Sequence, residues 1–318
     1  MKAITQDRYG SADVLELRDI EPPTIGDGDV LIRVEAAGVD AGVWHLMTGT
    51  PYLVRLATGL RAPKTRVRGM DVAGRVEAVG AKVTRFEPGD EVFGVCEGAF
   101  ADFAVAKPDK LVPKPTNVSA EQAAAVPTSA TTALRALRDT GGVQSGQSVL
   151  VIGAGGGVGS FAVQLAKAFG AEVTGVCSTS KIDLVKSLGA DHVVDYTRED
   201  ITGRYDLILD IAGNRPLRTV RRLLTPRGTL VIVGGEGGGR WLGMGRQFRA
   251  LAVSPFVRQR LRMMIAVTGE KDLLFLAELL EAGKLVPAVE RIYPLSETPE
   301  AIRRWAAGQA LGKLVITV

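Results

Sequence analysis

One stretch of the sequence decides the fold: Val149-Leu150-Val151-Ile152-Gly153-Ala154-Gly155-Gly156-Gly157-Val158-Gly159-Ser160. Four apolar residues end in a glycine cluster, and from Val158 to Phe169 apolar residues recur at the spacing of one buried helix face. This pattern predicts a strand, a tight turn and the start of a helix. Because glycines let the backbone approach a ligand and a helix N-terminus attracts anions, the variant fingerprint Ala154-x-Gly156-x-x-Gly159 indicates a dinucleotide site. A structural glycine turn in another kind of βα unit is the alternative.

The chain beyond this turn alternates apolar runs with helical patterns. Such alternation gives a parallel sheet, and ligands bind at the carboxyl ends of its strands. We therefore expect an α/β, doubly wound domain over residues 119–284, opened by a capping box at Ser119 to Gln122. Its later strands are expected at residues 172–177, 192–195, 205–211, 229–233 and 263–267.

The region of residues 1–118 has a different character. Short apolar or alternating runs are separated by turn signals such as Pro22-Pro23, which predicts a small β-rich barrel. Residues 47–68 look like a loop insertion with five basic residues, either a solvated surface loop or a flap over an active site. The β-rich style returns at the end of the chain, so residues 285–318 are expected to complete this first domain.

The composition fits a globular protein of about two domains, with 318 residues of which 46% are hydrophobic. The net charge of +4 suits an anionic cofactor but does not demand nucleic acid. Two cysteines, Cys96 and Cys177, allow no disulfide framework. The sequence shows neither a signal peptide nor a membrane span, so we expect a cytoplasmic protein.

Several motifs carry a resemblance to a known family. They are Gly69-Met70-Asp71-Val72-Ala73-Gly74, Pro88-Gly89-Asp90-Glu91-Val92, Ala154 to Gly159, Leu188-Gly189-Ala190-Asp191 and Gly312-Lys313-Leu314-Val315. Over essentially its whole length the chain resembles the medium-chain dehydrogenase/reductase superfamily, and within it the zinc-independent, zeta-crystallin-like quinone oxidoreductases. The resemblance implies a GroES-like β-rich catalytic domain, a Rossmann domain and a homodimer.

The zinc enzymes of this superfamily differ from the chain at the metal ligands. They have a cysteine near the position of Asp40 and a His-Glu pair where this chain has Met70-Asp71. Methionine is a poor zinc ligand, and neither Cys96 nor Cys177 falls at a ligand position. We therefore expect no metal, with an Asp40/His45 site as the alternative.

The end of the second strand discriminates between nicotinamide cofactors. An acid there would bind both ribose hydroxyls and repel a 2′-phosphate, but the chain has Ser178, Thr179 and Lys181. The two hydroxyls can donate to phosphate oxygens and the lysine can neutralise a charge, so we expect NADPH. Capping of the next helix by Ser178 and Thr179 can hold at the same time.

The family resemblance implies further cofactor contacts. Tyr196 would lie near the adenosine phosphate, and Gly156, Gly157 and Val158 would line the pyrophosphate. The nicotinamide end would be bordered by Thr128, Gly213, Asn214, Gly234 and Gly235.

The expected chemistry follows from the absence of a strong Lewis acid. Substrates that accept hydride readily are quinones and α,β-unsaturated carbonyl compounds. The catalytic candidates are Asp40, His45 and Tyr52, although His45 and Tyr52 are also compatible with ordinary packing. The family usually has an asparagine where Asp40 stands, and an ionised Asp40 would repel a developing oxyanion unless it is protonated, paired with an arginine or turned away.

Two other functions stay open. One is an enoyl-thioester reductase, which would need a long apolar channel. The other is an NADPH-binding protein with little catalysis, serving structure or binding RNA through the basic segment 240–262. No binding motif accompanies that segment, so we do not expect nucleic acid as a partner.

Overall fold

The computed structural model describes residues 1–234, 245–264 and 267–318. The chain forms two compact units, residues 1–131 with 268–318, and residues 132–267. The sequence-based boundaries, 118 and 285, both lie inside the first unit. The reason is that α3 (Ala120–Ala124) packs on β3 and β4, and α9 (Glu270–Glu281) packs on β7.

The first unit is built on a seven-stranded sheet of order β14-β15-β3-β4-β5-β7, with β6 paired to β3. Its pairs are antiparallel except for β14 and β15, which run parallel, and a two-stranded β1–β2 sheet accompanies it. The strands are β1 (Lys2–Thr5), β2 (Glu16–Asp19), β3 (Val30–Val39), β4 (Asp71–Val79), β5 (Glu91–Val95), β6 (Phe103–Ala106), β7 (Leu111–Pro113), β14 (Val289–Pro294) and β15 (Lys313–Thr317).

Alternating residues of β3 show why this sheet forms. Val30, Ile32 and Val34 are buried while Arg33 is exposed, so one face of the strand enters the core. The helix α10 (Thr298–Ala306) contributes Ile302 to the same core. The C-terminal strands β14 and β15 therefore belong to the sheet of the first unit.

The second unit contains a six-stranded parallel sheet of order β10-β9-β8-β11-β12-β13. Its strands are β8 (Ser148–Ile152), β9 (Glu172–Cys177), β10 (His192–Asp195), β11 (Tyr205–Asp210), β12 (Leu224–Ile232) and β13 (Arg260–Met263). The last strand begins three residues before the expected 263–267, because Leu261 is the buried apolar residue that enters the core; residues 265–266 lie outside the described part.

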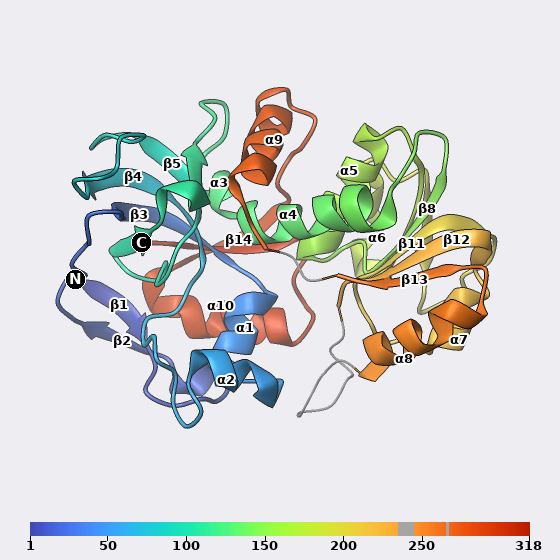
Figure 1. Cartoon of the computed structure of the whole chain (residues 1–318), viewed down its shortest axis with the longest axis horizontal. Coiled ribbons are helices and arrows are strands. Elements are labelled where there is room, and N and C mark those ends of the chain that lie inside the picture. Colours follow the sequence, from blue (N-terminus) through green and yellow to red (C-terminus); the bar gives the residue numbers. More distant parts are fainter. Residues whose placement is uncertain (235–244, 265–266) are drawn as a thin grey trace. The chain divides into compact units, whose positions relative to one another are not determined.

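Helices cover both faces of this sheet, as the alternation in the sequence predicted (Figure 1). The helices α5 (Gly157–Ala168) and α6 (Ile182–Ser187) pack on β8, β9 and β10. The opposite face is covered by α7 (Leu217–Arg221) and α8 (Gly245–Val253), whose Val220 and Ala250 join the core beneath them.

The remaining helices define the segments that carry candidate residues. The expected insertion is partly helical, with a short η2 (Tyr52–Val54) and α2 (Arg55–Thr58), and α1 (Ala41–Thr48) precedes it. The capping box at Ser119 and Gln122 is confirmed, and α4 (Pro127–Arg135) follows the short helix that it opens. Within the described residues, no helix combines the length and apolar character needed to cross a membrane.

Candidate functional site

The glycine turn between β8 and α5 is shaped to receive an anion. Gly153 has a left-handed φ of 94°, and a Cβ at position 159 would lie 2.1 Å from the Gly153 carbonyl oxygen. Gly156 is the N-cap of α5, so no side chain caps this helix, and its first turn contains no acidic residue. The backbone N–H groups of Gly157 and Val158 are therefore suited to a pyrophosphate.

The predicted cofactor residues of the second unit follow consecutive strands. Because all these strands are parallel, their carboxyl ends share one edge of the sheet, and the structure brings the residues together there. Gly235 lies outside the described residues, and Thr128 belongs to the first unit. Along this edge lie Gly156 to Val158 after β8, Ser178 to Lys181 after β9, Tyr196 after β10, Gly213 and Asn214 after β11, and Gly234 after β12.

The ends of β9 and β10 are joined by Asp195, a residue that the sequence did not single out. Its buried carboxylate accepts hydrogen bonds from the Thr179 hydroxyl and, at 2.7 Å, from the Thr197 hydroxyl. The Thr179 hydrogen bond is the main cause that lowers the pKa of Asp195. The Thr179 proton is thus already donated to a carboxylate, which differs from its expected role as a phosphate donor.

Two basic side chains lie near this junction. Arg198 is largely exposed, and its Nε is 3.6 Å from the Asp195 carboxylate. The Lys181 stem crosses the glycine turn, since a Cβ at Gly155 would lie 2.7 Å from the Lys181 Cβ. Sequence reasoning found Lys181 but missed Arg198, whose only signal was a basic residue three positions after a strand end.

A buried ion pair supports the loop after β11. Asp210 accepts a hydrogen bond from the Gly213 N–H at 3.0 Å and pairs with Arg246 of α8. Arg246 comes from the basic segment 240–262, so this member of the segment has a structural partner. That pairing weakens the only argument for an RNA-binding surface, although Arg240 lies outside the described residues.

In the first unit, Asp40 is the N-cap of α1. Its Oδ1 accepts hydrogen bonds from the backbone N–H groups of Gly42 at 2.6 Å and Val43 at 3.2 Å. Its Oδ2 is buried and has no hydrogen-bond partner, so no arginine of the described residues pairs with it. Helix capping therefore accounts for Oδ1 of Asp40, whereas Oδ2 has no hydrogen bond that gives it a structural role.

A second buried carboxylate, Asp71, lies at the start of β4. It accepts from the Thr128 N–H at 3.1 Å and from the Thr128 hydroxyl, and Lys313 Nζ is 3.9 Å away. Burial, together with the charge of Asp40, raises the pKa of Asp71 to about 7 despite Lys313 and Thr128. Lys313 also donates to the Val39 carbonyl, so the C-terminal strand is tied to β3. This cluster fixes Thr128, the candidate nicotinamide contact.

His45 and Tyr52 lie on neighbouring elements of the first unit. His45 Nδ1 lies 2.8 Å from the Thr50 carbonyl, which can only accept, so Nδ1 carries the proton and Nε2 of the neutral ring is an acceptor. The Arg55 guanidinium lies 4.6 Å from the centre of the Tyr52 ring and 4.5 Å from that of Tyr9. These contacts fix the two rings that sequence analysis could not place.

The described residues contain no group of three or more His, Cys, Asp or Glu side chains placed to hold a metal ion. Asp40 caps α1, whereas His45 contacts the Thr50 carbonyl.

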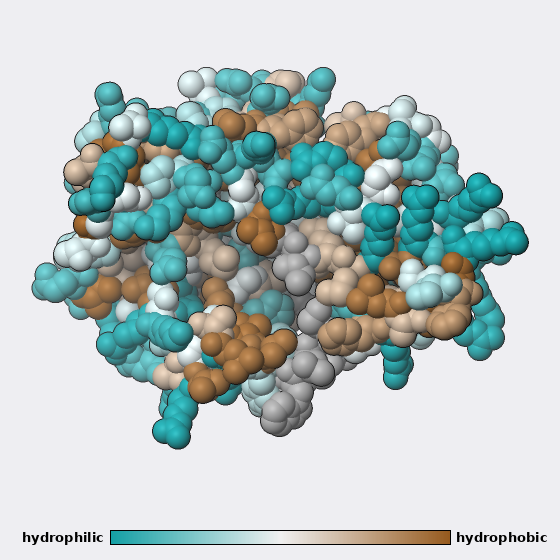
Figure 2. All heavy atoms as spheres, viewed as in Figure 1, coloured by the Kyte–Doolittle hydropathy of each residue, from teal (hydrophilic) through white to brown (hydrophobic). Residues whose placement is uncertain are grey.

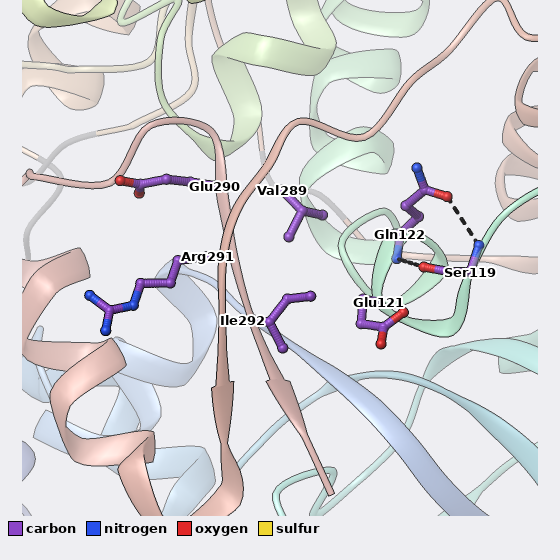
Figure 3. Close-up of a pocket in the computed structure, with 7 residues that line it drawn as sticks. All are labelled: Ser119, Glu121, Gln122, Val289, Glu290, Arg291 and Ile292. Carbon is purple, nitrogen blue, oxygen red and sulfur yellow. Dashed lines mark hydrogen bonds between the residues drawn. The ribbon is translucent and has the colours of Figure 1, made fainter.

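An open pocket of about 540 Å³ lies elsewhere in the first unit, between the start of α3 and the strand β14. Figure 3 shows that Gln122 and Ser119 on its wall are bonded to each other as the capping box, while Val289 and Ile292 face them from the strand. None of the predicted site residues lines this pocket.

Comparisons with known proteins cover both ends of the chain. Residues 26–116 match the family described as alcohol dehydrogenase GroES-like domain, and residues 188–316 match the one described as zinc-binding dehydrogenase. The chain is 31% identical to the chloroplastic quinone-oxidoreductase QR1 of Triphysaria versicolor, covering 99% of this chain and 98% of that protein. It is 33% identical to the 2-methylene-furan-3-one reductase of Solanum lycopersicum, covering 99% of this chain and 79% of that protein.

Solved structures agree with these relatives. The quinone oxidoreductase of Coxiella burnetii superposes with a TM-score of 0.88 at 29% identity, covering 100% of this chain and 99% of that one. The mycobacterial protein Rv1454c, solved in complex with NADPH, superposes with a TM-score of 0.85 at 27% identity, covering 100% of both chains. The GroES-like domain, the parallel Rossmann sheet and the near-complete coverage of quinone oxidoreductases establish the identity: this chain is an oxidoreductase of the medium-chain dehydrogenase/reductase superfamily, and it belongs to the quinone oxidoreductase group.

Proposed function

We propose that the protein transfers hydride from NADPH to quinones or to activated α,β-unsaturated carbonyl compounds without a metal. The observation that carries this proposal is the end of β9, where Ser178 and Lys181 stand in place of a ribose-binding carboxylate. The acceptor class is supported by relatives named quinone oxidoreductase and 2-methylene-furan-3-one reductase.

The preference for NADPH rests on charge at the ends of β9 and β10. Lys181 and Arg198 carry positive charge there, and the one buried carboxylate, Asp195, is engaged by two threonine hydroxyls. The Lys181 and Arg198 cations could each pair with a 2′-phosphate, whereas Glu199, which accepts from the Asp195 N–H, adds a negative charge nearby. The neighbour solved with NADPH supports the same choice.

The chain's own residues would hold the cofactor and orient the acceptor. The N-terminus of α5 would bind the pyrophosphate, and the Asp210-supported loop with Gly213 and Asn214 would border the nicotinamide. The reduced nicotinamide, when bound, supplies the hydride. Of the catalytic candidates, Tyr52 is the proposed hydrogen-bond donor to the substrate carbonyl, whereas Asp40 and the Nε2 atom of His45 could donate to it only when protonated. A quinone that accepts hydride leaves a weakly basic hydroquinone anion, which solvent can protonate.

Independence from zinc is supported by the donor chemistry. The segment that leads into β4 offers Met70, a poor zinc ligand, and Asp71, which is engaged by Thr128 and Lys313. The Nδ1 atom of His45 is engaged by the Thr50 carbonyl.

The experiment is a panel of quinones and enones assayed with NADPH and with NADH, before and after treatment with a chelator. We expect oxidation of NADPH with a simple quinone, at least about tenfold higher kcat/KM than with NADH, and no loss after chelation. Absence of NADPH oxidation with every acceptor would refute the proposal, and loss of activity on chelation would refute its metal-free part.

A second candidate is reduction of enoyl thioesters. One structural neighbour is titled CurK enoyl reductase, with a TM-score of 0.86 at 25% identity. Including an enoyl thioester in the panel separates the two proposed substrate classes.

We also propose that the protein is a homodimer, because β13 is an edge strand of the described sheet. We propose a cytoplasmic location, although relatives include chloroplastic and mitochondrial proteins.

A further inference from the structure

We propose that the leucine patch of η2, α2 and the turn that follows them, formed by Leu53, Leu56 and Leu60, docks the protein on an anionic lipid surface from which it takes a lipophilic quinone. This inference rests on the proposed function for its substrate class. The lipid docking itself can be measured without turnover.

The patch is unusually exposed for its apolar character. The exposed fractions are 48% for Leu53, 67% for Leu56 and 68% for Leu60. Leu53 and Leu56 are three residues apart on the successive helices η2 and α2, whereas Leu60 lies in the turn after Gly59, where α2 has ended. Figure 2 shows a contiguous hydrophobic area at the place where Figure 1 draws α2. Single exposed leucines are ordinary, but a contiguous group marks a surface that meets apolar matter.

The charge around the patch identifies the occupant. No Asp or Glu occurs between Ala41 and Met70, whereas five basic residues do. Among these, Arg55 is held between two tyrosine rings and Arg66 pairs with Asp7. Arg61 and Lys64 are exposed and make no ion pair with a described residue. Leucines beside free cations fit a membrane interface, where apolar side chains insert and cations meet anionic headgroups.

The position of the patch links docking to substrate. Leu53 directly follows Tyr52, a candidate contact of the substrate carbonyl, on the same short helix. The backbone of this segment is anchored, because Arg55 donates to the Gly49 carbonyl at 2.9 Å and the Tyr9 hydroxyl donates to the Gly59 carbonyl at 2.6 Å. The leucines are thus presented by a fixed loop. A quinone with an isoprenoid tail is the substrate that such a surface would meet.

The test is sedimentation of the full chain with phosphatidylcholine vesicles, with and without phosphatidylglycerol. We expect binding that requires phosphatidylglycerol and falls at high salt. The double variant Leu56→Ser/Leu60→Ser should lower the partition coefficient by about tenfold or more. Arg61→Gln and Lys64→Gln should each lower it about fivefold.

The matched control is Leu17→Ser/Leu274→Ser, which alters leucines that are 42% and 39% exposed on other elements. This control should bind vesicles like the wild type. All variants should reduce a short, water-soluble quinone at the wild-type rate, while only the patch variants lose turnover of a long-chain quinone held in vesicles.

Three results would overturn the docking proposal. They are absence of wild-type binding to phosphatidylglycerol vesicles, equal binding by the patch and control variants, and a loss of the dimer mass by light scattering in the patch variant alone. The last result would assign the patch to contact between copies. Failure of the proposed function would look different, because NADPH oxidation would be absent while vesicle binding could still be measured.

Discussion

The carboxyl group of Asp71 is completely buried and lies beside a second acid, Asp40. At the scale of single residues, this is where the chain accepts an electrostatic cost. The buried carboxyl group fixes Thr128, because both Asp71 oxygens accept from the Thr128 N–H and one also accepts from its hydroxyl. Lys313 offsets part of it from 3.9 Å.

The pKa of Asp71 predicts how pH acts on stability. Its pKa is near 3.8 in the unfolded chain and about 7 in the folded protein. Between these two values the folded state holds a proton that the unfolded state has lost. Binding of this proton stabilises the folded state, and the stabilisation disappears as the pH rises to about 7. Relative to Asp71→Asn, wild-type unfolding free energy should fall by about 1.4 kcal/mol per pH unit across this window. Urea unfolding at about pH 5, 6 and 7 measures the slope.

A control for this slope is Asp13→Asn. A hydrogen bond from Arg303 lowers the pKa of Asp13, so this group is ionised in both states across the window. The difference in unfolding free energy between Asp13→Asn and the wild type should therefore be independent of pH across this window. If the difference in unfolding free energy between Asp71→Asn and the wild type is also independent of pH, the assignment of a raised pKa to Asp71 is contradicted.

The residue scale also shows what the sequence could and could not reveal about the candidate cofactor site. Ser178 and Lys181 were predictable because they follow a recognisable strand. Asp195 and Arg198 were not singled out, because their importance depends on β10 lying beside β9 with Asp195 opposite Cys177. Register between strands brings these groups together, and a single sequence does not state it.

At the scale of elements, two glycines of the β8–α5 turn have separable tasks. A Cβ at Gly159 would lie 2.1 Å from the Gly153 carbonyl oxygen, whereas one at Gly156 would find only that oxygen, at 3.6 Å. We therefore expect Gly159→Ala to lower the unfolding free energy by about 1–3 kcal/mol, because the helix must move away from the turn. Gly156→Ala should lower the unfolding free energy by less than about 1 kcal/mol, the cost of a poorer N-cap. It should raise the Kd for NADPH at least about tenfold, because its methyl group would crowd the pyrophosphate.

Thermal unfolding and a fluorescence titration with NADPH check this pair of variants. Equal destabilisation of both would show that Gly156 serves packing. Unchanged NADPH affinity of a folded Gly156→Ala would remove the pyrophosphate from this turn.

The insertion at residues 47–68 was the element least determined by its sequence. Both the surface-loop and flap interpretations were open, and no apolar periodicity predicted α2. Its conformation depends on distant partners, such as the stacking of Arg55 on Tyr9 and the pairing of Arg66 with Asp7. Contacts of this kind are tertiary, so local propensity cannot supply them.

At the scale of the whole molecule, the net charge of +4 bears on cofactor capture. Salt screens the attraction between a positive protein and an anionic ligand. We expect the KM for NADPH to rise about fivefold between low and high salt, and the KM for NADH to rise less, because NADH lacks the 2′-phosphate. Steady-state kinetics over a salt series measure both. Equal responses would contradict a phosphate site made by Lys181 and Arg198.

The sequence by itself determined the class of this protein. The apolar run, the glycines and the helical period between Val149 and Phe169 act over a few residues, so local physics specified the turn, the parallel sheet and a nucleotide site. Only the tertiary structure decided which buried groups meet: Asp71 with Thr128 and Lys313, and Asp195 with Thr179. These partners lie far apart in the sequence, and burying charge is favourable only where the fold supplies hydrogen bonds and counter-charge in one place. The fold, rather than the motif, therefore selected the residues that shape the site.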